Sequence, residues 1–185
     1  MASVLVLDQK KRFQQELNRY ICSLPVFILT SRFNDNTWLE NTKYREKYPK
    51  FGCIYCSPER ISQRIPINQV NFVLEMNNER NCIMGIGMIR NRPYNNTFSV
   101  YDNQNYHRYQ YVGKSRIDRS EMNTEEETIM KVFDILCFKG NKHQKRGHGL
   151  KIFSLDMLFR CSKIMDLVDF IYQMFVRRSI IQLDK

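Results

Sequence analysis

The side chains that could do chemistry in this chain gather first in a short basic loop. Residues 139–151 contain five Lys or Arg residues, two histidines and three glycines, but no acidic residue. Clustered cations neutralise neighbouring phosphates, and glycines let the backbone approach them. We therefore predict a phosphate-binding loop made by Lys142, Lys145, Arg146, His148 and Lys151. The alternative is a solvated loop on the surface of a basic protein.

Aromatic residues form the second candidate group, because several stand in or beside polar loops instead of apolar runs. They are Trp38, Tyr55, Tyr94, Phe98, Tyr101 and Tyr106. An exposed ring near positive charge can stack on a nucleobase, at about 1–3 kcal/mol per base. The same rings could instead close the ends of a sheet as core residues, and both interpretations stay open.

Metal binding and catalysis find weaker support. Cys53 and Cys56 have two residues between them, and His143 and His148 lie far along the chain. Positions 53 and 56 of a strand point to opposite faces, so they do not chelate together. The sequence contains no nucleophile elbow, P-loop or zinc-protease helix motif. We expect a binding protein with no catalytic residue, no metal and no cofactor.

Composition agrees with a folded, cation-rich chain. The 185 residues are 43% hydrophobic, with only 7 Gly and 5 Pro, and the net charge is +10. These values exclude collagen-like and disordered classes and fit one domain. An excess of positive charge favours polyanionic partners, nucleic acid before membrane.

No apolar stretch is long enough to cross a bilayer, and the N-terminal residues do not have the order of a secretion signal. The six cysteines are scattered, mostly inside apolar segments, which is typical of reduced thiols. We expect an intracellular protein of the cytoplasm or nucleus that is not secreted.

The hydrophobic pattern predicts short strands with helices near the ends of the chain. Residues 8–24 have helical spacing, with Asp8 as a cap, and residues 38–47 contain a helical turn. Residues 118–131 are acidic and helix-prone, and Ser154 caps a last helix over 155–178. Strands are expected at 26–30, 51–56, 70–76, 82–89, 106–117 and 132–138, the third and fourth forming a hairpin.

This order, without a repeating strand-helix-strand rhythm, predicts an α+β fold with a small mixed β-barrel flanked by N- and C-terminal helices. We expect a helical extension over residues 1–24 and one domain over 25–185. Gly85 and Gly87 fall on one face of their strand, which indicates a barrel bend, a ligand or another close approach.

The order of these motifs resembles that of YTH domains, which read N6-methyladenosine in RNA and belong to the PUA-like superfamily with EVE and ASCH domains. The matching segments are Phe27–Ser31, Phe51–Ser57, Val70–Ile89, Tyr106–Ile117, Val132–Phe138 and Lys145–Leu150. The resemblance covers roughly residues 25–170. It implies a PUA-like barrel of YTH or EVE type.

The resemblance also implies a base-binding pocket. Tyr55 falls at the position of a cage tryptophan, Cys56 at a carbonyl that accepts the methylated amino group, and Ser57 just after it. Asn36, favoured over Asn34 and Asp35, would read the adenine edge. Tyr94, Tyr101 or Tyr106 would supply a second ring, with Trp38 also among the candidate aromatic residues, and Lys145 and Arg146 would contact phosphate.

The expected function is therefore recognition of a modified base, of N6-methyladenine type, in single-stranded RNA or DNA. One alternative is a hydrolase of modified nucleosides of the ASCH type. Another is a packaging protein that binds nucleic acid without reading a base. The terminal helices are expected to bind a second copy of the chain or a protein partner.

Overall fold

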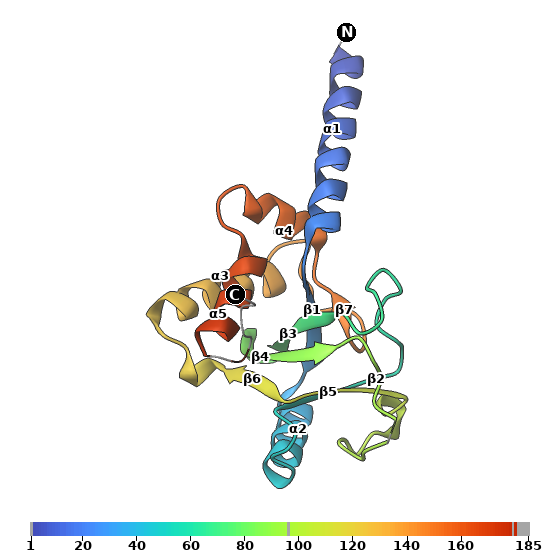
Figure 1. Ribbon diagram of the computed structural model, residues 1–185, viewed down its shortest axis with the longest axis vertical. Helices are drawn as coiled ribbons and strands as arrows, with labels where there is room; N and C mark the ends of the chain where they lie inside the picture. The colour runs from blue at the N-terminus through green and yellow to red at the C-terminus, as the bar shows by residue number, and fades with distance from the viewer. Residues whose placement is uncertain (1, 96, 179, 181–185) are drawn as a thin grey trace.

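The computed structural model describes residues 2–95, 97–178 and 180, and Figure 1 shows a mixed α and β molecule with one long projecting helix. The helices are α1 (Ala2–Ser23), α2 (Asp35–Lys47), α3 (Thr124–Phe138), α4 (Leu155–Ser162) and α5 (Leu167–Arg177). The short 3₁₀ helices are η1 (Gln104–Tyr106) and η2 (Arg119–Glu121). None of the helices described is both long and apolar enough to cross a membrane.

The strands form two sheets. They are β1 (Phe27–Phe33), β2 (Cys53–Ser57), β3 (Val70–Asn77), β4 (Cys82–Arg90), β5 (Tyr109–Gly113), β6 (Ser115–Asp118) and β7 (Lys151–Ile152). One sheet has the order β6-β4-β3-β1-β7, and β2 pairs with β5 in a separate ribbon. Among the strand pairs described, only β1 and β3 run parallel. The α+β class is confirmed, and the strands described here form no closed barrel.

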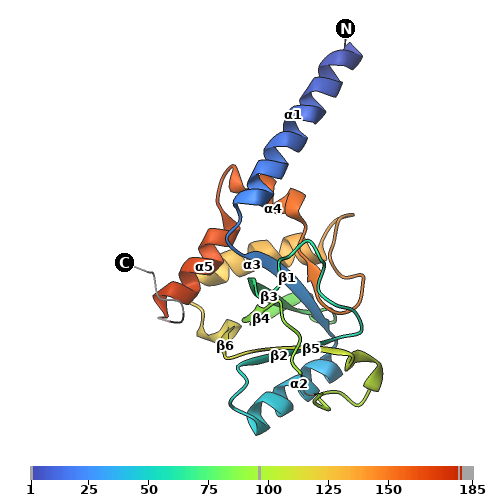
Figure 2. The same cartoon turned by 45° about the vertical axis from the view of Figure 1, so that its right-hand side comes forward.

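Both faces of the five-stranded sheet are covered by other elements. Alternate residues of each strand point to opposite faces. Ile28, Phe72 and Leu74 pack against α3, α4 and α5. Leu29 and Val73 pack against the β2–β5 ribbon. Figure 2 shows the ribbon and α2 on one side of this sheet and the three C-terminal helices toward the other.

The predicted strand over residues 132–138 is wrong, since this segment is the second half of α3. Asn123 begins the helix, and its side chain accepts from the backbone N–H of Glu126 in a capping box. Met130, Phe133 and Cys137 then follow at spacings of three and four and face the core. The sequence pattern predicted a strand here because a short apolar run does not distinguish a buried strand from a buried segment of helix.

Other predicted boundaries also change. The single strand expected over 106–117 is divided into β5 and β6, which pair with different partners, β2 and β4. The helix expected over 155–178 is two helices, and Asp166 caps the second. The turn expected over 38–47 is the full helix α2, which begins after Asn34. Asp8 lies inside α1 instead of capping it.

Several predicted features are confirmed. The β3–β4 hairpin has antiparallel register, from Val70 opposite Arg90 to Asn77 opposite Cys82. Ser154 caps α4 by accepting from the backbone N–H of Met157. At its C-terminal end α1 leans on α4, where the Tyr20 and Phe159 ring centroids lie 5.5 Å apart, and its other end projects away from the body (Figures 1 and 2).

Candidate nucleic-acid interface

Tyr55, the predicted cage residue, lies in the core and lines no open pocket. Its hydroxyl donates to Oε1 of Glu75 at 2.7 Å, and the side chain has no exposed surface. Burial, followed by the nearby Cys53 and Glu75, raises the pKa of Tyr55 well above its ordinary value. The space for this ring comes from Gly87, where a Cβ would collide with the Tyr55 hydroxyl. The close approach predicted at the face of Gly85 and Gly87 is therefore a contact within the chain itself and involves no ligand.

The neighbouring positions on β2 are also buried. Burial raises the pKa of Cys53 and of Cys56 to about 12, so both thiols are protonated at neutral pH. The Ser57 hydroxyl donates to the backbone carbonyl of Glu59 at 2.6 Å. Among the residues described, no cluster of His, Cys, Asp or Glu could hold a metal ion. This strand supplies neither a thiolate nor an exposed base contact.

Tyr101 belongs to a second buried polar group. Asn41 donates to the Tyr101 hydroxyl at 3.0 Å and to the carbonyl of Ile54 at 2.9 Å. The Nε2 atom of His107 accepts from the backbone N–H groups of Val100 and Tyr101, each at 3.1 Å. Desolvation lowers the pKa of His107. Tyr101 therefore closes this end of the core.

The remaining predicted pocket residues are spread over the surface and do not meet around one cavity. Trp38 on α2 packs edge-on against Phe33, and the guanidinium groups of Arg45 and Arg116 lie 5.6 and 5.5 Å from its ring. Asn36 is exposed on α2, and Tyr106 packs against Tyr101. Asn34 is occupied as the α2 cap.

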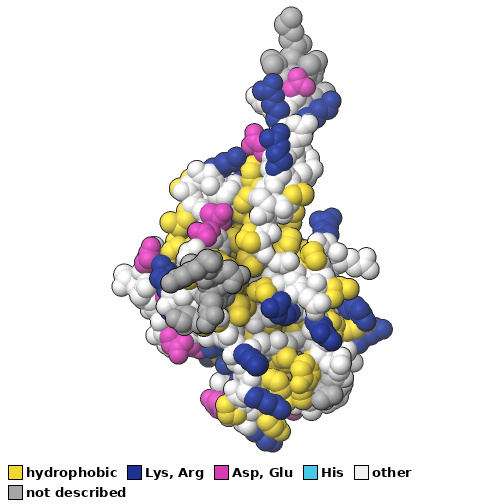
Figure 3. Space-filling view, viewed as in Figure 1, with side chains coloured by type: hydrophobic (Ala, Val, Ile, Leu, Met, Phe, Trp, Pro, Cys, Tyr) yellow, Lys and Arg dark blue, Asp and Glu magenta, His cyan; other side chains and the backbone are white. Residues whose placement is uncertain are grey.

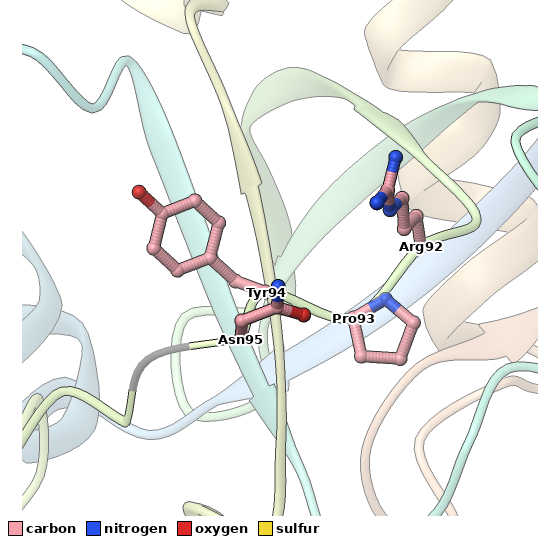
Figure 4. Close-up of a pocket in the computed structure, with 4 residues that line it drawn as sticks. All are labelled: Arg92, Pro93, Tyr94 and Asn95. Carbon is pink, nitrogen blue, oxygen red and sulfur yellow. The ribbon is translucent and has the colours of Figure 1, made fainter.

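Tyr94 is the predicted aromatic residue that is most open, with 43% of its surface exposed. Its backbone N–H donates to the carbonyl of Gln110, so the segment runs beside β5. Tyr94 and Arg92 line a shallow pocket with Pro93 and Asn95, and their side chains point to opposite sides (Figure 4).

The basic loop is folded onto the end of β2, and several of its cations already have partners. Lys151 pairs with Glu59 at 2.7 Å, and Lys142 lies 3.7 Å from Asp156. Lys145 donates to the Asn81 side chain at 2.8 Å. Arg146 and His148 are exposed, and neither forms an ion pair within the described part of the chain.

A cluster that the sequence analysis missed lies where β2 and β5 pair. Tyr109, opposite Ser57 in the ribbon, has the Arg60 and Arg108 guanidinium groups 5.2 and 5.6 Å from its ring centroid. A hydrogen bond from Arg60, with the charges of both arginines, lowers the pKa of Tyr109. The adjacent Arg108 and Tyr109 could have indicated a binding site from the sequence. Arg60 lies beside them only because β2 pairs with β5.

This cluster and the basic loop share one end of the ribbon. Gly149 packs against Ser57, three residues before Arg60, and Lys151 of the loop pairs with Glu59, the residue next to Arg60. Figure 3 shows Lys and Arg side chains along the projecting helix and over the lower and right-hand parts of the molecule, whereas the acidic side chains lie mostly toward the left. We call Arg60, Arg108, Tyr109, Arg146 and His148 the ribbon-end cluster.

A cavity of about 460 Å³ opens beside the ribbon-end cluster. Arg60 and Arg92 stand at it, and Ile61, Ile65 and Tyr111 are among the apolar residues that line it. A cavity of this size, mostly apolar with a few charged groups, is within the usual range of small-molecule sites. Comparison of the chain with protein-family models, with curated proteins and with solved structures finds no match.

Proposed function

We propose that this chain binds single-stranded nucleic acid, with the phosphates on the ribbon-end cluster. The observation that carries the proposal is the position of Arg60 and Arg108 beside the Tyr109 ring, because these two guanidinium groups have no carboxylate partner among the residues described. Two unneutralised charges beside an aromatic ring suit a strand that offers a phosphate and a base together.

The surrounding segments support this assignment. Residues 58–69 and 90–117 together contain seven Lys or Arg residues and two acidic residues. Only one of the seven, Arg116, forms an ion pair in the described structure, and it is buried beside Glu75. Of the other six, Lys114 lies at the opposite end of the ribbon. Arg60 and Arg92 line the cavity and Arg108 lies beside Tyr109, so positive charge extends from the end of the ribbon to the cavity. Such a field attracts polyanions and raises their association rate.

A PUA-like architecture of YTH or EVE type is part of the proposal. Its support is the arrangement of the strands: β1 parallel to β3, a β3–β4 hairpin, and a β2–β5 ribbon laid against β4. In the resemblance described above, a first strand, a hairpin and an aromatic strand also precede a basic loop and a final helix. The strand that it matched to Val132–Phe138 is replaced here by the second half of α3. The loop between residues 138 and 151 and the two helices after it occupy those positions.

Recognition of N6-methyladenine is a second candidate, and Tyr109 is the observation that favours it. This half-buried ring stands opposite Ser57, next to the loop that contains Gly149. It could take the stacking role first expected of Tyr55. One buried methyl group contributes about 0.8 kcal/mol, or about a fourfold change in affinity. Titration with methylated and unmethylated strands tests this role, which equal affinities for wild type would exclude.

The proposed function is tested by Arg60→Ala combined with Arg108→Ala. The binding of a 15-nucleotide single strand, RNA and DNA in turn, is measured by fluorescence anisotropy over a range of salt. We expect at least tenfold weaker binding and a salt slope shallower by about 1.4, at about 0.7 per phosphate contact on single strands. The matched control is Arg12→Ala with Arg19→Ala, two exposed arginines of α1. Equal effects of the two pairs would remove the ribbon-end cluster from the interface.

Association through the terminal helices stays a prediction, and light scattering of the intact chain tests it. The α1 helix contacts α4 through Phe13 and Tyr20, which meet Phe159 at 5.3 and 5.5 Å.

A further inference from the structure

A group of five aromatic rings lies beside β5, apart from the ribbon-end cluster. It consists of Tyr44, Tyr48, Phe51, Tyr94 and Phe98, which we call the aromatic platform. Neighbouring centroids lie 4.8 Å apart for Tyr44 and Tyr48, 5.1 Å for Phe51 and Phe98, and 5.3 Å for Tyr94 and Phe98. Five rings from three chain segments therefore form one continuous group.

The chain holds these rings in place through defined contacts. The end of α2 supplies Tyr44 and Tyr48, and the backbone N–H of Phe51 donates to the carbonyl of Tyr48 at 3.0 Å. Buried Gln110 holds the other side, because its Oε1 accepts from the N–H of Phe98 at 2.7 Å and its Nε2 donates to the Phe98 carbonyl at 2.6 Å. The platform is thus fixed to the same strand that bears Tyr109.

Core packing explains only part of this group. Phe51 is buried, and Tyr44 and Phe98 pack partly into the core. Tyr48 and Tyr94 are different, because they keep 36% and 43% of their surface exposed. No hydrogen bond of their hydroxyl groups is found in the described structure. Two partly exposed rings at the edge of a ring cluster can accept further aromatic groups.

The charges around the platform identify the kind of partner. The Nζ atoms of Lys47 and Lys50 lie 5.4 and 5.0 Å from the ring centroids of Tyr48 and Phe51. Arg92 is exposed two residues before Tyr94, but its side chain points to the other side and lines the cavity with Arg60. None of these three cations forms an ion pair in the part of the chain described. Rings bordered by free cations complement a chain of aromatic bases joined by phosphates.

The platform also continues the site of the proposed function. The backbone N–H of Tyr94 donates to Gln110, the residue next to Tyr109 on β5. A strand bound at Tyr109 therefore has a short path along β5 to Tyr94. Partly exposed rings can stack on unpaired bases, whereas the bases of a duplex are already stacked on one another.

We infer that Tyr48 and Tyr94 of the aromatic platform stack on unpaired bases of a nucleic acid strand that extends from the ribbon-end cluster, with Lys47, Lys50 and Arg92 on its phosphates. This inference rests on the proposed function and adds a selectivity to it. The platform makes the chain prefer single strands to duplexes of the same sequence.

The test is Tyr48→Ala combined with Tyr94→Ala, compared with wild type on a 15-nucleotide single strand and on its blunt duplex. We expect single-strand affinity to fall about 5- to 150-fold for each stacked base lost, with duplex affinity and the salt slope unchanged. The matched control is Tyr48→Phe with Tyr94→Phe, which keeps the rings and should keep the affinity. Equal thermal unfolding of all variants verifies the fold.

Two outcomes would overturn the inference in distinguishable ways. If the alanine pair binds the single strand as wild type does while Arg60→Ala with Arg108→Ala binds weakly, the proposed function holds and the platform has no part in it. If wild type binds neither the single strand nor the duplex, the proposed function and the inference both fail.

Discussion

The two faces of the five-stranded sheet are built by different chemistry. The face under α3, α4 and α5 is almost entirely apolar, with Ile28, Phe72, Leu74, Phe133 and Phe175 at its centre. The face under the β2–β5 ribbon contains apolar residues too, but it also buries several polar and charged side chains. These are Asn41, Tyr55, Glu75, Tyr101, His107, Gln110 and Arg116.

The difference indicates that the two faces have different tasks. Apolar packing stabilises without requiring any single partner, whereas each buried polar group must meet a particular partner. On the ribbon face, Glu75 aligns Tyr55 and Arg116, and Gln110 holds the Phe98 segment. We therefore interpret the helical face as the main source of stability and the ribbon face as the scaffold that positions the proposed interface.

The largest expected effect comes from breaking the buried pair of the ribbon face. Glu75 and Arg116 lie 2.8 Å apart, with side chains 1% and 8% exposed. Glu75→Ala leaves the Arg116 charge buried with less compensation and should lower the free energy of unfolding by about 3–5 kcal/mol. Glu75→Leu with Arg116→Met, an apolar pair, should cost clearly less than the single change. Urea denaturation measures both.

On the helical face, Phe133→Ala should cost a similar amount, about 3–5 kcal/mol, by leaving a cavity. Because Phe133 has no charged partner, no second substitution comparable to Arg116→Met can reduce this loss of stability. If the apolar pair at 75 and 116 is as unstable as Glu75→Ala, the polar network of the ribbon face does not act as coupled charges. The contrast between the two faces would then be wrong.

A smaller effect is expected at the edge of the helical face, where Glu126 accepts from Arg178 and Arg177. The hydrogen bond from Arg178, with the charges of both arginines, lowers the pKa of Glu126 below its ordinary value of 4.5. The unfolded chain therefore binds this proton more readily. The stabilisation is fully present above about pH 4.5 and is lost as the pH falls through the lowered pKa.

Glu126→Gln should accordingly lower the free energy of unfolding by about 1.5–3 kcal/mol at neutral pH, the usual range for charged hydrogen bonds. The difference from wild type should shrink as the pH falls below 4.5. Thermal unfolding between pH 3 and 7 measures it. A difference that stays constant over that range would show that the carboxylate charge contributes nothing.

Local patterns were enough to predict one part of this molecule. The β3–β4 hairpin, the N-terminal helix and the cap at Ser154 depend on residues close in sequence, and each is confirmed. The α+β class followed from the order of such elements. The second half of α3 was missed because its apolar run from Val132 to Phe138 is too short to separate a buried strand from a helix.

The site depended on contacts that no local pattern contains. Tyr55 was expected to line a pocket, but its burial depends on Gly87, a residue on another strand. Arg60 and Arg108 meet only because β2 pairs with β5. Basic residues could be recognised from the sequence as a group. Which of them already have a carboxylate partner, as Lys151 has Glu59, is decided by tertiary structure.

The smallest expected effect tests how closely the ribbon packs on the sheet. A Cβ at Gly87 would overlap the Tyr55 hydroxyl and lie 2.8 Å from the Cys53 sulfur. Gly87→Ala should therefore cost about 1–3 kcal/mol, as other overpacked core substitutions do. In a Tyr55→Phe background the cost should fall, because the nearest colliding atom is gone while Cys53 remains.

The substitutions at Gly87 and Tyr55 form a double-mutant cycle. Gly140 supplies its matched control, because a Cβ there meets no atom within 4 Å. Its φ of +74° makes Gly140→Ala costly through the backbone alone, at about 1–2 kcal/mol, and Tyr55→Phe should leave that cost unchanged. Coupling of Tyr55 to position 87 but not to position 140 would locate the contact between ribbon and sheet at this ring. Equal coupling at both positions would mean that Tyr55→Phe loosens the whole fold, and the tight packing of the ribbon face would lose its support.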